Sequence, residues 1–450
     1  MVTVVGLFMD LIAVLARLAG RLGPSSSRWL EAELAEAARQ HKVRWVPRSR
    51  WSSAVTGTCE DLSVGVDFEW KKPSEVESDQ LHLCLTVSGP RIPSGLAFAA
   101  ERGTGDDVLT GDTGFDDLVE VRGEPTIILA LLDREIRQRV GEFVGLGGSL
   151  KAGRLACSSP TSFASGEIAR GLRLGLWLAR ELSSPGGGVC ERLAHNARLD
   201  PSPGVRLWNL WQLHERFPET PQAREASRQD LADPSPWVRL TAARFLNDEG
   251  IETLEGLAQD RGVPESAAAD AVALLAARCP VARAGPLLVA ALKAHSGEAR
   301  VQAVQELGRL RYQPARKPLL VLLGRADPRC AAAAAEALGA LGDASAEAAL
   351  LKAVDSDARE LRLAAIRALG VMGSVAAVEP LLAFGAGRRL DGESRQAVRD
   401  AVGAIQSRLA GAEAGQVSLA APSPGSGWLS VATLEVEPGR LSLLPDRKQG

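Results

Sequence analysis

The stretch Asp200-Pro-Ser-Pro-Gly-Val-Arg-Leu207 returns 33 residues later as Asp233-Pro-Ser-Pro-Trp-Val-Arg-Leu240, with seven of eight positions identical. A second motif recurs every 31 residues, as Glu306-Leu-Gly308, Ala337-Leu-Gly339 and Ala368-Leu-Gly370. Self-similarity at such a period is typical of stacked helical repeats. Both motifs belong to one repeating unit, because an arginine precedes the motif leucine by seven residues in four copies.

Each repeat is predicted to form two helices joined by a short turn. The first helix carries an apolar pattern such as that of residues 315–323, and the turn often holds Asp and Pro, as in Asp327-Pro328. Asp caps a helix N-terminus and Pro fits the first helical turn, so the second helix is expected to start there. We predict that the closing glycine of each triplet ends that helix in the left-handed conformation.

The repeats predict a mostly α fold, an α-solenoid of about seven helical hairpins preceded by a small α+β domain. Residues 63–70 and 81–87 alternate apolar and polar side chains, as half-buried strands do. Residues 124–143 predict one helix, and residues 149–156 a last strand. The expected segments are an apolar N-terminal helix (1–24), an α+β domain (25–157), a linker and leading helix (158–186), the solenoid (187–410) and a flexible tail (411–450).

This repeat pattern resembles HEAT repeats, in particular the short bacterial HEAT-like type named after phycobilisome lyases. The resemblance covers about half of the chain and implies an extended concave surface, built from the second helices. It is specific for the fold and says little about function, since this repeat occurs in scaffolds, adaptors, inhibitors and a few enzymes. The segment around Phe115 is loosely similar to bacterial membrane-anchored proteins of unknown function.

Two interpretations stay open for the apolar segment Met1–Ala16, in which Asp10 is the only charged residue. The segment is shorter than the roughly 20 residues of a spanning helix. It is either a helix packed on its own domain or a tether that holds a cytoplasmic protein at the bacterial inner membrane. The tail carries three Gly-x-apolar-Ser-apolar pieces that start at Gly415, Gly427 and Gly439 and predict short strands.

Composition argues against several classes of function. The net charge is −3 and aromatic residues make up only 4% of the chain, which disfavours nucleic-acid binding. The six cysteines include no C-x-x-C pair, so we expect reduced, mostly buried thiols and no metal site. We expect no cofactor.

No catalytic constellation stands out in the sequence. The carboxylates at positions 106, 107, 112, 116 and 117 do not match a calcium loop and predict a solvated turn. HEAT-type deoxyhypusine hydroxylases hold two irons with several His-Glu pairs, and this chain has one such pair, His214-Glu215. The sequence therefore predicts a protein that is not an enzyme.

Two sets of residues are candidates for partner binding. The four arginines that precede the motif leucine by seven residues have two possible roles. They form either a structural ladder that pairs with carboxylates or turn carbonyls, or a line that binds an acidic partner or phosphate. The tryptophans near the start of the solenoid either pack in the core or against the N-terminal domain, or form a binding hot spot if they are exposed. These candidates are Arg206, Arg239, Arg300, Arg362, Trp208, Trp211 and Trp237.

The function that these observations favour is a non-enzymatic scaffold or adaptor that binds a protein partner on the concave face of the solenoid. One alternative is an enzyme or enzyme subunit like the bilin lyases, which requires a groove for a tetrapyrrole. A weaker alternative is a HEAT protein that binds nucleic acid, which predicts salt-sensitive retention on DNA.

Overall fold

The computed structural model describes residues 35, 39–40, 42–45, 55–71, 80–100, 107–160, 167–183, 186–387, 391–408, 417–419 and 429–431. The predicted helix at residues 1–24 lies outside them. Among the described residues, no helix has both the length and the apolar character needed to cross a bilayer. The chain forms two compact units, a first unit of residues 1–250 and a second unit of residues 251–450.

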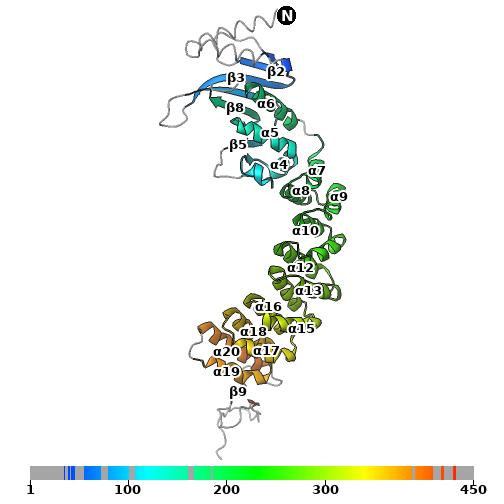
Figure 1. The fold of residues 1–450 in the computed structure, drawn as a ribbon, viewed down its shortest axis with the longest axis vertical. Helices are drawn as coiled ribbons and strands as arrows, with labels where there is room; N and C mark the ends of the chain where they lie inside the picture. Colours follow the sequence, from blue (N-terminus) through cyan, green and yellow to red (C-terminus); the bar gives the residue numbers. More distant parts are fainter. Residues whose placement is uncertain are drawn as a thin grey trace, which may run out of the picture. The chain divides into compact units, whose positions relative to one another are not determined.

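The first unit begins with an antiparallel sheet in the order β1-β2-β3-β4-β8-β7-β5-β6 (Figure 1). The predicted strands at 63–70 and 81–87 are confirmed as β3 and β4, whose alternate residues Val64, Val66, Leu85 and Val87 are buried. The strands are β1 Arg44–Trp45, β2 Val55–Cys59, β3 Leu62–Lys71, β4 Gln80–Ser88, β5 Ala97–Ala99, β6 Glu120–Arg122, β7 Gly148–Lys151 and β8 Arg154–Pro160.

The single helix predicted for residues 124–143 is wrong, because the chain forms two helices there. α4 (Pro125–Leu131) ends at Leu132, and α5 (Arg134–Gly145) starts after Asp133. The Asp133 carboxylate accepts the backbone N–H of Ile136 at 3.0 Å and caps α5, which fixes the break. The predicted last strand is likewise two strands, since Ala152 and Gly153 both adopt positive φ and turn the chain between β7 and β8.

The helix expected to lead into the repeats belongs to the α+β domain instead. α6 (Glu167–Ser183) packs against β4 and β8, and Figure 1 shows it beside β8. Its leucines share a buried cluster with the strands. These leucines are Leu172, Leu174, Leu176, Leu178 and Leu182. The carboxylates of residues 107–117 are not simply solvated either. Asp116 accepts the backbone N–H groups of Thr110 and Gly111, and Asp107 accepts that of Val121.

Two helical hairpins complete the first unit, and five make up the repeats of the second unit. The described residues thus hold seven repeat hairpins, as the repeat spacing predicted. In the first unit they are α7 (Val189–Leu199) with α8 (Pro203–Arg216) and α9 (Pro221–Asp230) with α10 (Pro236–Phe245), followed by the short turn η1 (Asn247–Gly250). In the second they are α11 (Ile251–Gln259) with α12 (Glu265–Arg278), α13 (Val281–Ala294) with α14 (Glu298–Arg309), α15 (Arg316–Arg325) with α16 (Pro328–Leu341), α17 (Glu347–Val354) with α18 (Arg359–Met372), and α19 (Val378–Gly385) with α20 (Gly392–Ser407).

The aspartates of the turns start the second helices in two ways. Asp327 caps α16 directly, as predicted, by accepting the N–H of Cys330 at 3.1 Å. In the Asp-Pro-Ser-Pro copies the cap residue is the serine, and the aspartate two residues earlier accepts that serine's N–H. In each case the start of the second helix depends on the aspartate of its turn.

The three motif glycines do not end their helices, which corrects the prediction of a left-handed cap. Gly308, Gly339 and Gly370 lie inside α14, α16 and α18 without positive φ. A Cβ built on Gly339 would lie 2.8 Å from Cα of Ala368, so the missing side chain lets neighbouring second helices approach closely. The left-handed cap of α16 is Gly342 instead.

The described part of the tail contains two short strands. β9 (Val417–Leu419) and β10 (Leu429–Val431) pair antiparallel. They correspond to the first two of the three Gly-x-apolar-Ser-apolar pieces, and the third lies outside the described residues.

Replacing Gly339 by Ala is expected to destabilise the protein by about 1–3 kcal/mol, because the new methyl overpacks a filled helix contact. A matched control is Gly403→Ala in α20, whose added Cβ meets nothing within 4 Å. This control is expected to gain up to about 1 kcal/mol of helix propensity. Thermal unfolding of the full chain measures both changes, and equal melting temperatures for the two variants would contradict the packing role.

Candidate functional site: the arginine ladder and the tryptophan surface

Arg206 joins the two hairpins of the first unit. Its Nε and Nη2 donate to the two carboxylate oxygens of Asp233, in the turn before α10, at 2.7 and 2.8 Å. Its Nη1 donates to the carbonyl of Asp200, in the turn before its own helix, at 2.8 Å. Both charged side chains are buried, so this bidentate pair replaces water on each of them.

The other predicted arginines also donate to carbonyls close before their own helices, Arg239 and Arg362 to turn residues and Arg300 to the end of α13. Nη1 of Arg239 donates to the carbonyl of Asp233 at 2.8 Å, and Nε of Arg300 donates to that of Leu292 at 3.1 Å. Arg362 donates to the Ser356 carbonyl at 3.0 Å and lies 3.1 Å from Asp391. All four guanidinium groups therefore have partners within the chain, which is the arrangement expected of a structural ladder.

The contacts of the ladder also change the pKa of Asp391, a turn carboxylate of the second unit. Hydrogen bonds from Ser394, together with the Arg362 guanidinium, lower the pKa of Asp391 to about 2. The carboxylate is thus ionised at any physiological pH.

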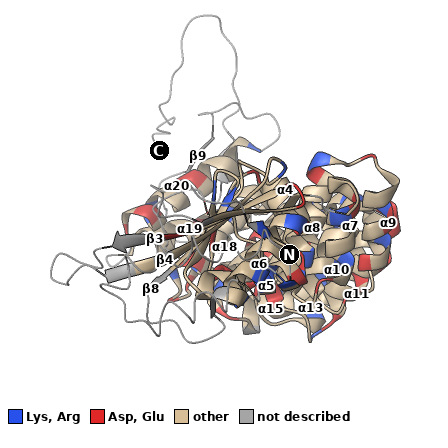
Figure 2. Cartoon of the chain, turned by 90° about the horizontal axis from the view of Figure 1, so that it is seen from above, with Lys and Arg blue, Asp and Glu red and all other residues tan. Residues whose placement is uncertain are grey.

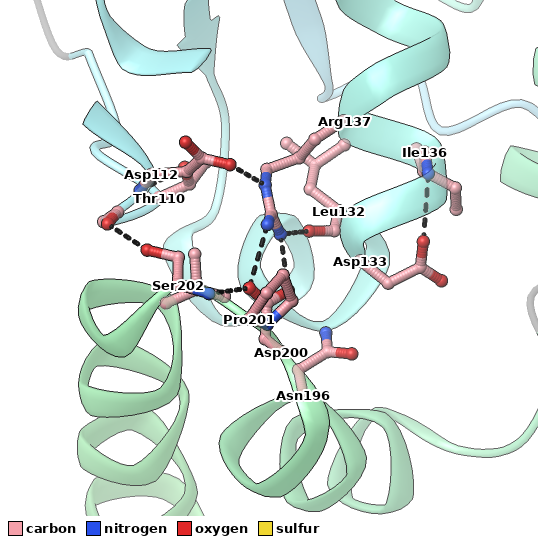
Figure 3. A network of polar contacts seen from close by, with 12 residues as sticks. Thr110, Asp112, Leu132, Asp133, Ile136, Arg137, Asn196, Asp200, Pro201 and Ser202 are labelled. Carbon is pink, nitrogen blue, oxygen red and sulfur yellow. Dashed lines mark hydrogen bonds and ion pairs between the residues drawn. The ribbon is translucent and has the colours of Figure 1, made fainter. Parts of the chain in front are cut away.

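Arg137 of α5 is a fifth arginine of the ladder, and the repeat spacing did not predict it (Figure 3). Its Nη1 and Nη2 donate to the two oxygens of Asp200 at 2.9 and 3.0 Å, and its Nε lies 3.1 Å from Asp112. Burial alone would lower the pKa of Arg137, but the hydrogen bonds and negative charges of Asp200 and Asp112 together outweigh burial, and the pKa is raised. Arg137 therefore pairs with the first turn aspartate as Arg206 pairs with the second.

A signal for this role was present in the sequence. Arg137 stands four residues after the cap Asp133, and Arg206 stands four residues after the cap Ser202. Arg137 also donates to a carbonyl just before its own helix, that of Leu132 at 2.8 Å. The position was hidden because no Asp-Pro-Ser-Pro motif precedes it.

α4 and α5 form a hairpin that precedes the first repeat. Leu129 and Ala130 of α4 belong to the core of the repeats, together with Leu193 and Leu210. Hydrogen bonds from α7 to α4 add to this apolar contact. Arg192 donates to the Ala130 carbonyl at 2.8 Å, and the Asn196 amide donates to that of Leu129 at 2.9 Å; Figure 3 shows Asn196 beside the Arg137 network. The α+β domain is therefore joined to α7 and α8 by core packing as well as by ion pairs.

Asp230, at the end of α9, is a buried carboxyl group beside this ladder. It is only 3% exposed, and its Oδ2 has no hydrogen-bond partner among the described residues. Burial and the neighbouring Asp233 carboxylate raise the pKa of Asp230 to about 7, against a smaller opposing effect of Arg206 and Arg198. The side chain thus exchanges a proton near neutral pH.

The three predicted tryptophans are exposed, so of the alternatives predicted for them, packing in the core is wrong. Trp208 is 44% exposed, while Trp211 and Trp237 are each 37% exposed. Trp211 lies edge-on to Phe245 of α10, with ring centroids 5.3 Å apart, and the Arg244 guanidinium lies 6.0 Å from its ring. These contacts place the exposed faces of α8 and α10 on one surface.

We define the tryptophan surface as the residues of α8, α10 and η1 that share this face, all of them exposed except the half-buried Arg244. On α8, Trp208, Trp211 and Glu215 are spaced by three and four residues and so lie on one side of the helix. One repeat later, Arg244 and Asp248 take the places of Trp211 and Glu215. The members are Trp208, Trp211, Glu215, Trp237, Arg244 and Asp248.

His214 is a packing residue. Its ring stacks on Phe245 with centroids 3.9 Å apart, and its Nε2 lies 2.6 Å from the Ser227 hydroxyl. Burial lowers its pKa, so the ring is neutral at pH 7. Within the described ranges, no group of three or more His, Cys, Asp or Glu side chains is arranged to hold a metal ion. None of the six cysteines forms a disulfide within the described residues, and five of them are buried.

Comparison with known proteins agrees with the repeat spacing. A family model described as HEAT repeats matches residues 285–370 and, in a second overlapping match, residues 317–403. These residues run from α13 to α20, so the chain contains HEAT repeats in its second unit. No curated protein matches the chain. The phycobilisome-lyase type of the repeat stays a prediction.

Replacing Arg206 by Met is expected to cost about 3–5 kcal/mol, because Asp233 would remain buried without its cation. Arg239→Met is the matched control, since Arg239 holds the same helix position but binds only turn carbonyls among the described residues. It should cost clearly less. Urea unfolding of the full chain measures both, and similar losses for the two variants would show that the carboxylate pairing contributes little.

The raised pKa of Asp230 makes stability fall as pH rises. The folded state holds the proton up to about pH 7, whereas the unfolded carboxyl loses it near 3.8. Between pH 6 and 8.5 this group alone should cost about 1.4 kcal/mol. Asp230→Asn should remove that loss and raise the melting temperature at pH 8.5. The exposed Asp248→Asn serves as control, and an unchanged pH dependence in Asp230→Asn would refute the assignment.

Proposed function

We propose that the protein is a non-enzymatic scaffold that binds another protein through the tryptophan surface of its first unit. The HEAT repeats support this, since stacked helical hairpins present long rows of exposed second-helix residues. The observation that carries the proposal is the exposure of three tryptophans on two adjacent helices. Tryptophan is enriched in binding hot spots, and exposed clusters of large apolar side chains mark interaction sites.

The ladder arginines are not the proposed contact. Arg206 is buried, and the guanidinium groups of Arg239 and Arg362 are directed at turn carbonyls. They stabilise the helices that present the tryptophans. Basic and acidic residues both occur among the helices drawn in Figure 2, and the net charge of the chain is −3, which favours a protein partner over a nucleic-acid backbone.

The test is affinity capture from a lysate of the source organism with the full chain and two variants. Changing Trp208, Trp211 and Trp237 together to Ser should abolish retention of the partner, while circular dichroism should show unchanged helix content. The control changes Val321 and Leu382, which are exposed on first helices of the second unit, to Ser. Retention of the same proteins by the tryptophan variant would refute the proposal.

A further inference from the structure

Two carboxylates of the tryptophan surface have no cation partner among the described residues. Glu215 and Asp248 are both exposed, and neither takes part in an ion pair there. Neighbouring charges are paired with each other instead: Arg216 with Glu124, and Arg228 with Glu249. Arg244 is the one basic member of the surface, so the two carboxylates leave the surface with a net negative charge.

Glu215 also stands where a carboxylate is poorly placed for helix stability. It lies in the last turn of α8, which ends at Arg216. The helix dipole is negative at that end and favours cations. A residue that opposes its local environment without a compensating contact in the fold is a candidate for a role in binding.

The tryptophan rings suit the same kind of ligand as the carboxylates. Indole faces attract guanidinium and ammonium groups, with tryptophan the most effective of the aromatic residues. The surface already contains one such contact, since the Arg244 guanidinium lies over Trp211. Glu215 follows Trp211 by four residues, so a cation on the exposed ring would lie within reach of that carboxylate.

We propose that the tryptophan surface binds a basic segment of a partner protein, whose Arg or Lys side chains stack on the indoles and pair with Glu215 and Asp248. The proposal rests on the proposed function and adds the chemistry of the partner. The ladder does not oppose it, because Arg206 is buried and paired with Asp233 and so presents no free positive charge to the segment.

The experiment titrates the full chain with three end-capped 12-residue peptides in which Ser alternates with Arg, Gln or Glu, monitored by tryptophan fluorescence. The Arg peptide should bind, with an affinity that falls as salt rises. The Gln peptide should bind at least about tenfold more weakly, and the Glu peptide should not bind. Equal binding of the Arg and Gln peptides would overturn the proposal.

Variants then locate the binding. Glu215→Gln with Asp248→Asn should weaken binding of the Arg peptide about tenfold, as loss of charge-assisted contacts does. The control pair, Asp355→Asn with Glu379→Gln, removes the same charge from exposed positions of the second unit and should leave binding unchanged. Equal weakening by both pairs would show general charge attraction and refute the site.

The outcome also separates this inference from the proposed function. If the captured partner depends on the tryptophans but an aromatic photo-crosslinker in place of Trp208 marks a segment without Arg or Lys, the scaffold function stands and the inference fails. If the tryptophan variant keeps every captured protein, the scaffold function fails first. A dimer of the chain in sedimentation that the tryptophan variant loses would assign the surface to a second copy and overturn the inference.

Discussion

The buried pairing of an arginine with the aspartate of the next turn is the interaction on which the first unit depends. Arg137 holds Asp200, and Arg206 holds Asp233, each through two hydrogen bonds. Each aspartate in turn accepts the N–H of the serine that caps the following helix. Removing a single charge leaves its partner buried and unpaired, which costs far more than the net stabilisation of an intact pair. The pairing therefore specifies how one hairpin follows another, and it fixes the orientation of α8 and α10, whose outer sides carry the tryptophans.

Much of this arrangement follows from the sequence because spacing is a local property. The 33-residue return of the Asp-Pro-Ser-Pro motif predicts the hairpins and the phase of the arginines, and both agree with the structure. The strands β3 and β4 were predictable for the same reason, since alternation along one segment determines which side chains are buried.

Features that depend on a distant neighbour were not predictable in this way. Glycine is common at helix ends, but Gly339 lies inside a helix, where its missing side chain leaves room for Ala368 of the next repeat. Trp208 and Trp211 have the character of core residues, yet the core side of α8 is already occupied by Val205, Leu210 and Leu213. Arg137 carries no motif, and only the fold shows that Asp200 lies opposite. The sequence thus named the tryptophans as candidates for partner binding, while their exposure and the unpaired carboxylates beside them required the structure.

The hairpin of α4 and α5 has a consequence for how copies of the chain behave toward one another. The two end faces of a stack of repeats are complementary, as the faces between neighbouring repeats are, so an uncovered stack can add a second molecule head to tail without closing a ring. Here Leu129 and Ala130 cover the first repeat, and the α+β domain that carries them is too different in shape to be repeated. The apolar face at this end of the repeats is therefore already covered within the chain and is not open to the repeats of a second copy.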